Sequence, residues 1–300
     1  MTRGTEARTS TAPKRVVYTA VVGGYEQLND QPVAKESGTD FVCFTDDPDL
    51  RSDTWQLRVI EPRFPLDPIR SARFLKCRGT ELLSDYDESL WIDNSVRLKR
   101  DPSRLFDDWL SDADLAVPRH SLRGSVIAEF EAVATLGYDD SARVYEQLIH
   151  YTQLNERVLH DVPFWTALIA RRHAAPVLDR MELWYDHLLR YSRRDQLSVN
   201  FVLADAPFEI RVIEVDNAES DFHEWPVHNN RNWSLTRGSF SRALRIPLAE
   251  VGERDNLIRE LQERLADERD RAVRIEESYQ KSFSWRVTRP VRAVRDFLKR

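Results

Sequence analysis

The strongest constraint on the fold is an alternation of short apolar runs with helical patterns over the first 120 residues. Residues 15–22 (RVVYTAVV) form a β-branched, nearly all-apolar run, which predicts a buried strand that stops at Gly23-Gly24. Further strands are expected at residues 41–44, 55–60, 89–92 and 113–117. Strands that alternate with helices predict an α/β fold, with a mainly parallel sheet covered by helices on both faces.

Two Asp-Pro pairs mark where helices begin. Asp67-Pro68 and Asp101-Pro102 each place a capping carboxylate before a proline at the first helical position. The later pattern predicts helices at residues 126–159, 177–189 and 195–203, and strands at residues 163–170 (PFWTALIA) and 208–215. We therefore expect one domain over residues 14–235.

Composition excludes disulfide miniproteins, collagen-like repeats and wholly disordered chains. The 300 residues are 41% hydrophobic with 9 Gly and 14 Pro, which predicts a packed core without low-complexity tracts. The two cysteines form no CxxC pair and favour a reduced, cytoplasmic compartment. No apolar run approaches the roughly 18 residues of a membrane span, and residues 1–13 lack the apolar core of a signal peptide. We expect residues 1–13 to be a disordered leader.

The charge is unevenly distributed, and the residue pattern of the carboxy-terminal region differs from that of the preceding domain. The net charge is −6, and the acidic body argues against nucleic acid as a partner. Residues 248–281 are expected to form a long helix or a coiled coil that could join two copies of the chain. A solvated helix docked on its own domain is the alternative. The heptad positions are Ile258, Leu261, Leu265, Ala272, Ile275 and Tyr279.

Residues 282–300 carry six basic residues and one acidic residue. Their apolar residues recur at helical spacing, which predicts a basic amphipathic helix on an anionic membrane surface. A helix that covers a bare patch of the domain is the alternative. The apolar stripe consists of Phe283, Val287, Val291, Val294 and Leu298.

Polar residues that follow the predicted strands are candidate ligand contacts, because ligands bind beyond the carboxyl ends of parallel strands. Asp93 could hold a divalent cation that bridges a diphosphate, or could simply form a turn. Gly23-Gly24-Tyr25 could bring backbone close to a ligand, or form a plain turn. Thr45 and Asp46 could bind a nucleoside or cap their loop.

Several charged groups have both a structural and a chemical interpretation. One expected helix carries a basic residue at every third position: Arg70, Arg73 and Lys76. This spacing puts them along one face, which either binds an anion or is simply solvated. Asp195 stands where a helix cap is favoured, or could accept a proton from an acceptor hydroxyl. The polar pair after residue 117 and the two late histidines are further candidates: His120, Arg123, His223 and His228.

Six segments in order resemble a glycosyltransferase-like family long known as a domain of unknown function, whose plant members are linked to mucilage polysaccharide. The resemblance covers roughly residues 15–230, and it implies the nucleotide-sugar-binding GT-A fold for this domain. The segments are YTAVVGGYEQL (18–28), FVCFTDD (41–47), RSARFLKC (70–77), SLWIDNSVRL (89–98), RHSLR (119–123) and SRRDQLS (192–198).

The resemblance also implies roles for individual residues. Asp93 matches the first acidic position of a DxD-type motif that holds Mn²⁺ or Mg²⁺, but Ser95 replaces the second acidic residue. Independently of the resemblance, His223 or His228 is a candidate further ligand of that metal. Asp195 would be the acceptor-side base if configuration inverts; if it is retained, Asp195 or Gln196 would orient the sugar. The implied donor-binding residues are Thr19, Gly23, Gly24, Tyr25, Thr45, Asp46, Arg73, Lys76, His120, Arg123 and Arg194.

The segment SFSWRVTRPVR (282–292) resembles a short element, S-x-S-W-R-x-T-x-P-x-R, that recurs in bacterial enzymes building surface polysaccharides. Together the two resemblances imply transfer of a sugar from a nucleotide diphosphate to a glycan or lipid-linked glycan acceptor, at the inner face of the cell membrane. Two rival functions are a metal-dependent hydrolase of a lipid amide, as in a ceramidase, and a non-catalytic glycan-binding scaffold.

Overall fold

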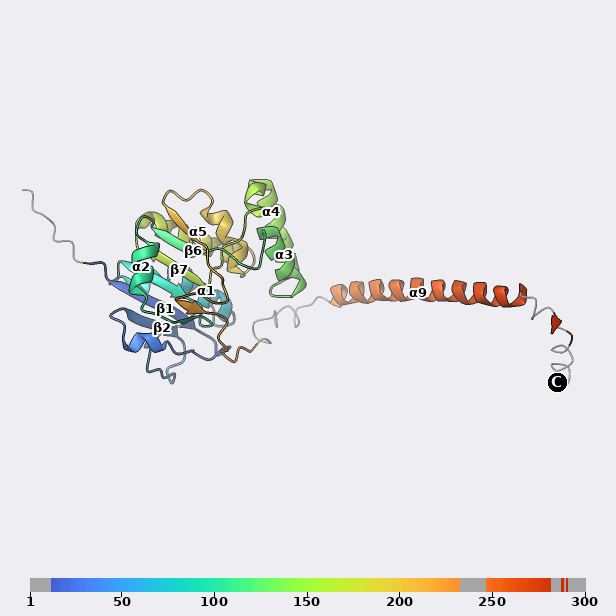
Figure 1. The fold of residues 1–300 in the computed structure, drawn as a ribbon, viewed down its shortest axis with the longest axis horizontal. Coiled ribbons are helices and arrows are strands. Elements are labelled where there is room, and N and C mark those ends of the chain that lie inside the picture. The colour runs from blue at the N-terminus through green and yellow to red at the C-terminus, as the bar shows by residue number, and fades with distance from the viewer. Residues whose placement is uncertain (1–11, 233–246, 282–286, 289, 291–300) are drawn as a thin grey trace, which may run out of the picture. The chain divides into compact units, whose positions relative to one another are not determined.

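The computed structural model describes residues 12–232, 247–281, 287, 288 and 290 (Figure 1). The chain divides into two compact units, Met1–Ser239 and Phe240–Arg300. Most of the expected leader and of the expected basic tail lies outside the described residues.

The first unit is built on a seven-stranded sheet in the order β3-β2-β1-β4-β7-β6-β8. β7 runs antiparallel to both of its neighbours, and the other neighbouring strands are parallel. This topology confirms the expected α/β fold with a mainly parallel sheet. The strands are β1 (Arg15–Val21), β2 (Asp40–Thr45), β3 (Gln56–Val59), β4 (Glu88–Ile92), β6 (Leu115–Pro118), β7 (Leu168–Arg172) and β8 (Ile210–Ile213), and a separate pair joins β5 (Arg97–Leu98) to β9 (His223–Glu224).

One predicted strand begins later than expected. Residues 163–170 are apolar, but β7 begins at Leu168 and continues to Arg172. Ahead of it, Trp165 N–H donates to the Pro118 carbonyl over 2.7 Å, and Phe164 N–H donates to Asn200 Oδ1 over 2.9 Å. The prediction for residues 163–167 was wrong because a short apolar run does not reveal whether it is buried as a strand or as a loop.

The helices begin where their capping residues predict. Asp67 accepts a hydrogen bond from the Arg70 N–H at the start of α1 (Pro68–Arg78), and Asp101 accepts one from the Ser103 N–H at the start of α2. The remaining helices are α2 (Ser103–Trp109), α3 (Val126–Thr135), α4 (Ser141–Leu159), α5 (Ala175–Arg190) and α6 (Val199–Leu203), with 3₁₀ turns η1 (Pro32–Lys35), η2 (Gly79–Leu83) and η3 (Asp195–Leu197).

Two expected helices are each divided. The helix predicted for residues 126–159 is broken between α3 and α4 near Gly137, whose φ of 64° a helix interior does not allow. The helix predicted for residues 195–203 consists of η3 followed by α6. The tight turn of η3 holds Asp195 at the edge of the sheet's ligand-binding side.

Both faces of the sheet are covered, because successive side chains of a strand point to opposite faces. On one face, Tyr18 of β1 packs in a cluster with Leu75 of α1 and Trp184 of α5. On the other face, Val17 joins a cluster with Phe106 and Trp109 of α2. The sheet therefore lies between α1 and α5 on one side and α2 on the other (Figure 1).

The second unit contains α9 (Pro247–Lys281), which confirms the expected long helix. Four of its apolar side chains are each 51–56% exposed in this helix: Leu257, Ile258, Leu261 and Leu265. The coiled coil stays a prediction. Among the described residues, no helix combines the length and apolar character that crossing a bilayer requires.

Candidate active site

A pocket lies where β1 and β4 end, and α1 forms one of its walls. The space between its walls is about 980 Å³, including open solvent at its mouth. It also receives residues from the loop before β7 and from η3. Six residues predicted from the sequence line it: Tyr25, Arg73, Asp93, Arg194, Asp195 and Gln196.

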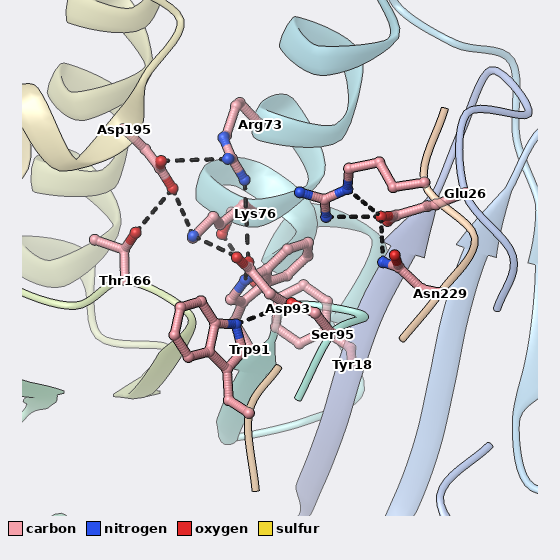
Figure 2. Close-up of polar contacts among 12 residues, drawn as sticks. Tyr18, Glu26, Arg73, Lys76, Trp91, Asp93, Ser95, Thr166, Asp195 and Asn229 are labelled. Carbon is pink, nitrogen blue, oxygen red and sulfur yellow. Dashed lines mark hydrogen bonds and ion pairs between the residues drawn. The ribbon is translucent and has the colours of Figure 1, made fainter. Parts of the chain in front are cut away.

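Four charged side chains lie together at this pocket, and we call them the charge cluster: Arg73, Lys76, Asp93 and Asp195 (Figure 2). Arg73, Asp93 and Asp195 line the pocket, whereas Lys76 is fully buried and does not line it. Lys76 Nζ lies 2.5 Å from Asp195 Oδ2 and 3.3 Å from Asp93 Oδ1. Arg73 lies 3.3 Å from Asp195 Oδ1 and 4.0 Å from Asp93 Oδ1. Arg73 and Lys76 can share these partners because residues three apart are neighbours on a helix.

Asp195 is ionised, and both of its carboxylate oxygens have partners. Its side chain is 2% exposed, and Thr166 Oγ1 donates a third contact over 3.0 Å. Burial by itself would raise the pKa of Asp195, but Arg73 and Lys76 outweigh it and hold that pKa well below its usual range. A carboxylate this acidic, with both oxygens bonded, accepts protons weakly. The geometry thus favours a positioning role for Asp195 over a role as base.

Asp93 has the same two cations beside it and Trp91 as its third donor, but its side chain is 27% exposed. Trp91 Nε1 donates to Asp93 Oδ1 over 2.8 Å. Burial again opposes ionisation, yet Lys76 and Arg73 lower the pKa of Asp93 from its usual value. Asp93 is therefore a carboxylate at neutral pH, and every contact found for it among the described residues goes to Oδ1.

A second ion pair lines the pocket beside Tyr25. Glu26 Oε2 accepts hydrogen bonds from Arg231 and from Asn229 Nδ2, both over 2.7 Å. The backbones are joined as well, since Gln27 N–H donates to the Asn229 carbonyl over 2.8 Å. Burial raises the pKa of Glu26, and Arg231 opposes that rise. Neither Glu26 nor Arg231 was singled out from the sequence, because 205 residues separate them.

Aromatic rings form much of the remaining wall. Trp165 and Trp225 lie edge to face, with ring centroids 5.5 Å apart. The Arg194 guanidinium lies over the Tyr138 ring, 5.0 Å from its centroid. Flat apolar surfaces beside a few charged groups are typical of a site that binds an organic ligand. The sequence offered no signal for Trp165 or Trp225, since both fall in segments that resemble core or loop.

Three buried donors in this pocket have no hydrogen-bond partner among the described residues. They are Arg73 Nε, Arg194 Nε and Gln196 Nε2. Buried polar groups in folded proteins are almost always bonded, so each unpaired one calls for an explanation. The three side chains belong to residues that line the pocket, but the nitrogens themselves are covered by protein atoms, so a ligand rich in acceptor oxygens, such as a diphosphate or a sugar, would bond them after these side chains shift.

Tyr25 of the first predicted loop lines the pocket, but the two glycines before it and the loop after β2 do not. The Gly23 N–H donates to both carboxylate oxygens of Asp46, at 2.9 and 3.0 Å. Thr45 Oγ1 accepts from the Asp47 N–H over 3.1 Å, as a loop cap does. Thr19 is fully buried in β1. The donor-binding role expected for Thr19, Gly23, Gly24, Thr45 and Asp46 stays a prediction.

His120 and Arg123 also lie outside the pocket lining. His120 Nδ1 accepts from the Leu122 N–H over 3.0 Å, and burial lowers the pKa of His120 to about 4. Arg123 is engaged by Glu129 over 3.1 Å. These contacts are structural, and the donor-binding role of both residues stays a prediction.

The described residues do not fit the divalent cation that the family resemblance implies at Asp93. Ser95 Oγ, at the second position of the motif, accepts from Trp225 Nε1 over 3.1 Å. His223 is fully buried and contacts Ser220 and Asn217, while His228 is exposed. Over the described part of the chain, no three His, Cys, Asp or Glu side chains are grouped as metal ligands.

Comparison with known proteins identifies relatives. The model of the family described as TOD1/MUCI70, glycosyltransferase-like domain, matches residues 44–218. Over 159 residues the chain is 28% identical to the "Probable hexosyltransferase MUCI70" of Arabidopsis thaliana, which covers 49% of this chain and 27% of that protein. The chain thus matches about a quarter of the length of this curated relative.

Similar solved structures include three glycosyltransferases. One is involved in glycosylation of the major capsid of PBCV-1, with TM-score 0.38, 12% identity, and coverage of 67% of this chain and 82% of that chain. The bifunctional WbbM apo structure has TM-score 0.39, 12% identity, and coverage of 70% and 40%. Mouse xyloside xylosyltransferase 1 has TM-score 0.39, 10% identity, and coverage of 67% and 84%.

Proposed function

Because the chain belongs to the TOD1/MUCI70 glycosyltransferase-like domain family, we propose that it transfers a sugar from a nucleotide diphosphate donor. In that reaction the bond from the anomeric carbon to the diphosphate oxygen breaks, and a bond to an acceptor hydroxyl oxygen forms. The hydroxyl proton leaves to a base or to solvent. The observation that carries the proposal is the set of unpaired donors on Arg73, Arg194 and Gln196 in one pocket.

The hard step is the development of negative charge on the leaving diphosphate. Preorganised donors that meet developing charge in a buried site stabilise a transition state strongly. Arg194 suits this task, since it lines the pocket and its guanidinium makes no direct ion pair among the described residues. The charges of Glu129 and Asp195 interact with it over longer distances. Arg73 reaches the same space from α1 while anchored on Asp195.

In this proposal, residues of the η3 turn bind the donor sugar. Gln196 has a free amide donor that can orient a hydroxyl of the donor sugar. Asp195 acts through Arg73 and Lys76, whose positions it sets. The alternative in which Asp195 is the acceptor-side base would require its pKa to rise once the donor is bound.

The acceptor and the cellular site are finer parts of the proposal. The sequence of residues 282–292 supports a glycan or lipid-linked glycan acceptor in bacterial surface polysaccharide synthesis, at the inner face of the cell membrane. Membrane attachment and self-association through the carboxy-terminal region belong to the same proposal. The rival lipid-amide hydrolase would need a metal site, which the two late histidines do not supply within the described residues.

Calorimetry with UDP-, GDP- and dTDP-sugars tests the donor class. One panel member should bind the wild type, and Arg194→Met should weaken its Kd about 10- to 100-fold, because a hydrogen bond to a charged group contributes about 1.5–3 kcal/mol. Arg194→Lys should retain part of the affinity. Arg190→Met is the matched control, since Arg190 is an exposed residue at the end of α5 that pairs with Glu146 of α4.

Thermal melts would establish that each variant is folded. Equal affinity of the Arg194→Met variant and the wild type would remove Arg194 from the donor site. Cleavage of a lipid amide without any nucleotide-sugar binding would instead favour the hydrolase, and glycan binding without either would favour the scaffold.

A further inference from the structure

The charge cluster already holds a cation between its two carboxylates. Lys76 Nζ lies 2.5 Å from Asp195 Oδ2 and 3.3 Å from Asp93 Oδ1, so one ammonium bridges both groups (Figure 2). Asp93 is the residue at which the family resemblance implies a metal. A bridging position between two carboxylates is the one that a divalent cation would take.

Neighbouring aromatic rings and backbone hydrogen bonds hold the Lys76 ammonium in place. The Lys76 side chain is fully buried, and its charge lies 5.5 Å from the Trp91 ring and 6.0 Å from the Trp184 ring. The Lys76 carbonyl accepts from the Tyr18 hydroxyl over 2.9 Å and from the Arg171 guanidinium over 2.7 Å. Both the backbone and the side chain of Lys76 are therefore held, and the ammonium cannot readily move aside for a metal.

Neighbouring groups leave little for a metal to bind. Asp195 uses both oxygens on Arg73, Lys76 and Thr166. Asp93 Oδ1 is shared by Trp91 and Lys76, which leaves one carboxylate oxygen. A divalent cation on that oxygen would also lie close to two fixed positive charges, and like charges repel strongly in a buried site.

We propose that Lys76, supported by Arg73, takes the place of the divalent cation at Asp93, so that the site binds its diphosphate ligand without a metal. The identity of the diphosphate rests on the proposed function; the filled cation position between Asp93 and Asp195 does not.

The first test is calorimetry of wild-type protein with UDP, GDP and dTDP, in buffer containing EDTA and in buffer containing Mn²⁺. The nucleotide that binds should show a Kd that differs less than twofold between the two buffers, after correction for Mn²⁺ held by the nucleotide itself. A Kd that weakens tenfold or more in EDTA would overturn the proposal.

The second test removes the ammonium and needs no nucleotide. Lys76→Met leaves Asp93 and Asp195 facing a vacated position, so this variant should take up Mn²⁺ and reduce the electron paramagnetic resonance signal of the free ion. Wild-type protein and the Lys76→Met/Asp93→Asn double variant should leave that signal unchanged. Uptake by wild type, or none by folded Lys76→Met, would contradict the proposal.

The two tests separate the inference from the proposed function. Failure of wild type to bind any nucleoside diphosphate in either buffer would count against the proposed donor, while the Mn²⁺ comparison would still decide the role of Lys76. If circular dichroism shows that Lys76→Met does not fold, Lys76→Gln removes the same positive charge and replaces that variant in the Mn²⁺ test. The comparison of nucleotide binding by wild type with and without EDTA tests the proposal independently of either variant.

Discussion

At the level of single residues, Asp195 organises the charge cluster. It is buried, and its charge holds Arg73 and Lys76 where the pocket needs them. Sequence reasoning selected Arg73, Lys76, Asp93 and Asp195 individually, and the structure brings all four together. Their roles in the reaction stay predictions. The pairing of these cations with these carboxylates depends on distances that spacing along the chain does not give.

The lowered pKa of Asp195 predicts a pH-dependent contribution to stability. In the unfolded chain an Asp titrates near pH 4, and in the fold its pKa lies well below that. The contribution is therefore complete above about pH 4 and is lost as the pH falls toward the folded-state pKa. Asp195→Asn should lower the free energy of unfolding by about 3–5 kcal/mol at pH 7, as expected for breaking a buried ion pair.

Urea unfolding of wild type and Asp195→Asn between pH 7 and pH 3 measures this difference. It should be constant down to about pH 4 and shrink below it. Glu146→Gln is the control, since Glu146 is a surface carboxylate paired with Arg190 and should show little change. A gap that stays the same across the whole range would mean that Asp195 is not a carboxylate stabilised by its cations.

At the scale of elements, the turn after β1 determines where α1 lies. Gly23 has a φ of 76°, and a Cβ added there would overlap Pro68, the first residue of α1. Gly24 has a φ of 62° but open space around it. The sequence pair Gly23-Gly24 predicted a tight turn, but not that only the first glycine is in close contact with the helix that carries Arg73 and Lys76.

The two glycines provide a matched pair of variants. Gly24→Ala should cost about 1–2 kcal/mol, the penalty for a left-handed residue with a side chain. Gly23→Ala should cost about 2–5 kcal/mol, because overpacking against Pro68 adds to that penalty. Denaturant unfolding measures both, and nucleotide affinity should fall more for Gly23→Ala as α1 shifts. Equal losses for the two variants would show that the contact with Pro68 has no effect.

On the scale of the whole molecule, the pocket and all three buried apolar clusters lie within the first unit. The described side chains of α9 between residues 256 and 278 are exposed. Because the pocket lining and these clusters draw only on residues of the first unit, we expect the sheet domain to keep its stability without the second unit. The heptad pattern of α9 leaves self-association as a prediction.

A chain that ends at Ser239 should melt within about 1–2 °C of the full-length protein, since surface changes are usually within about 0.5 kcal/mol and 1 kcal/mol shifts the Tm of such a domain by about 2–4 °C. Its nucleotide affinity should also be unchanged. Tryptophan fluorescence melts and calorimetry of both chains provide the comparison. A drop of about ten degrees would show that α9 or its neighbours stabilise the domain.

The amino-acid sequence by itself was sufficient for the α/β fold, for the helix starts marked by Asp67-Pro68 and Asp101-Pro102, and for the long helix ending near Lys281, because capping and hydrophobic periodicity are local properties. Tertiary structure alone decided that Glu26 pairs with Arg231, that Trp165 lies in a loop that lines the pocket, and that Lys76 bridges Asp93 and Asp195. Each of these depends on how α1 and the late segments pack against the ends of β1 and β4. Such packing is set by contacts between residues far apart in the chain.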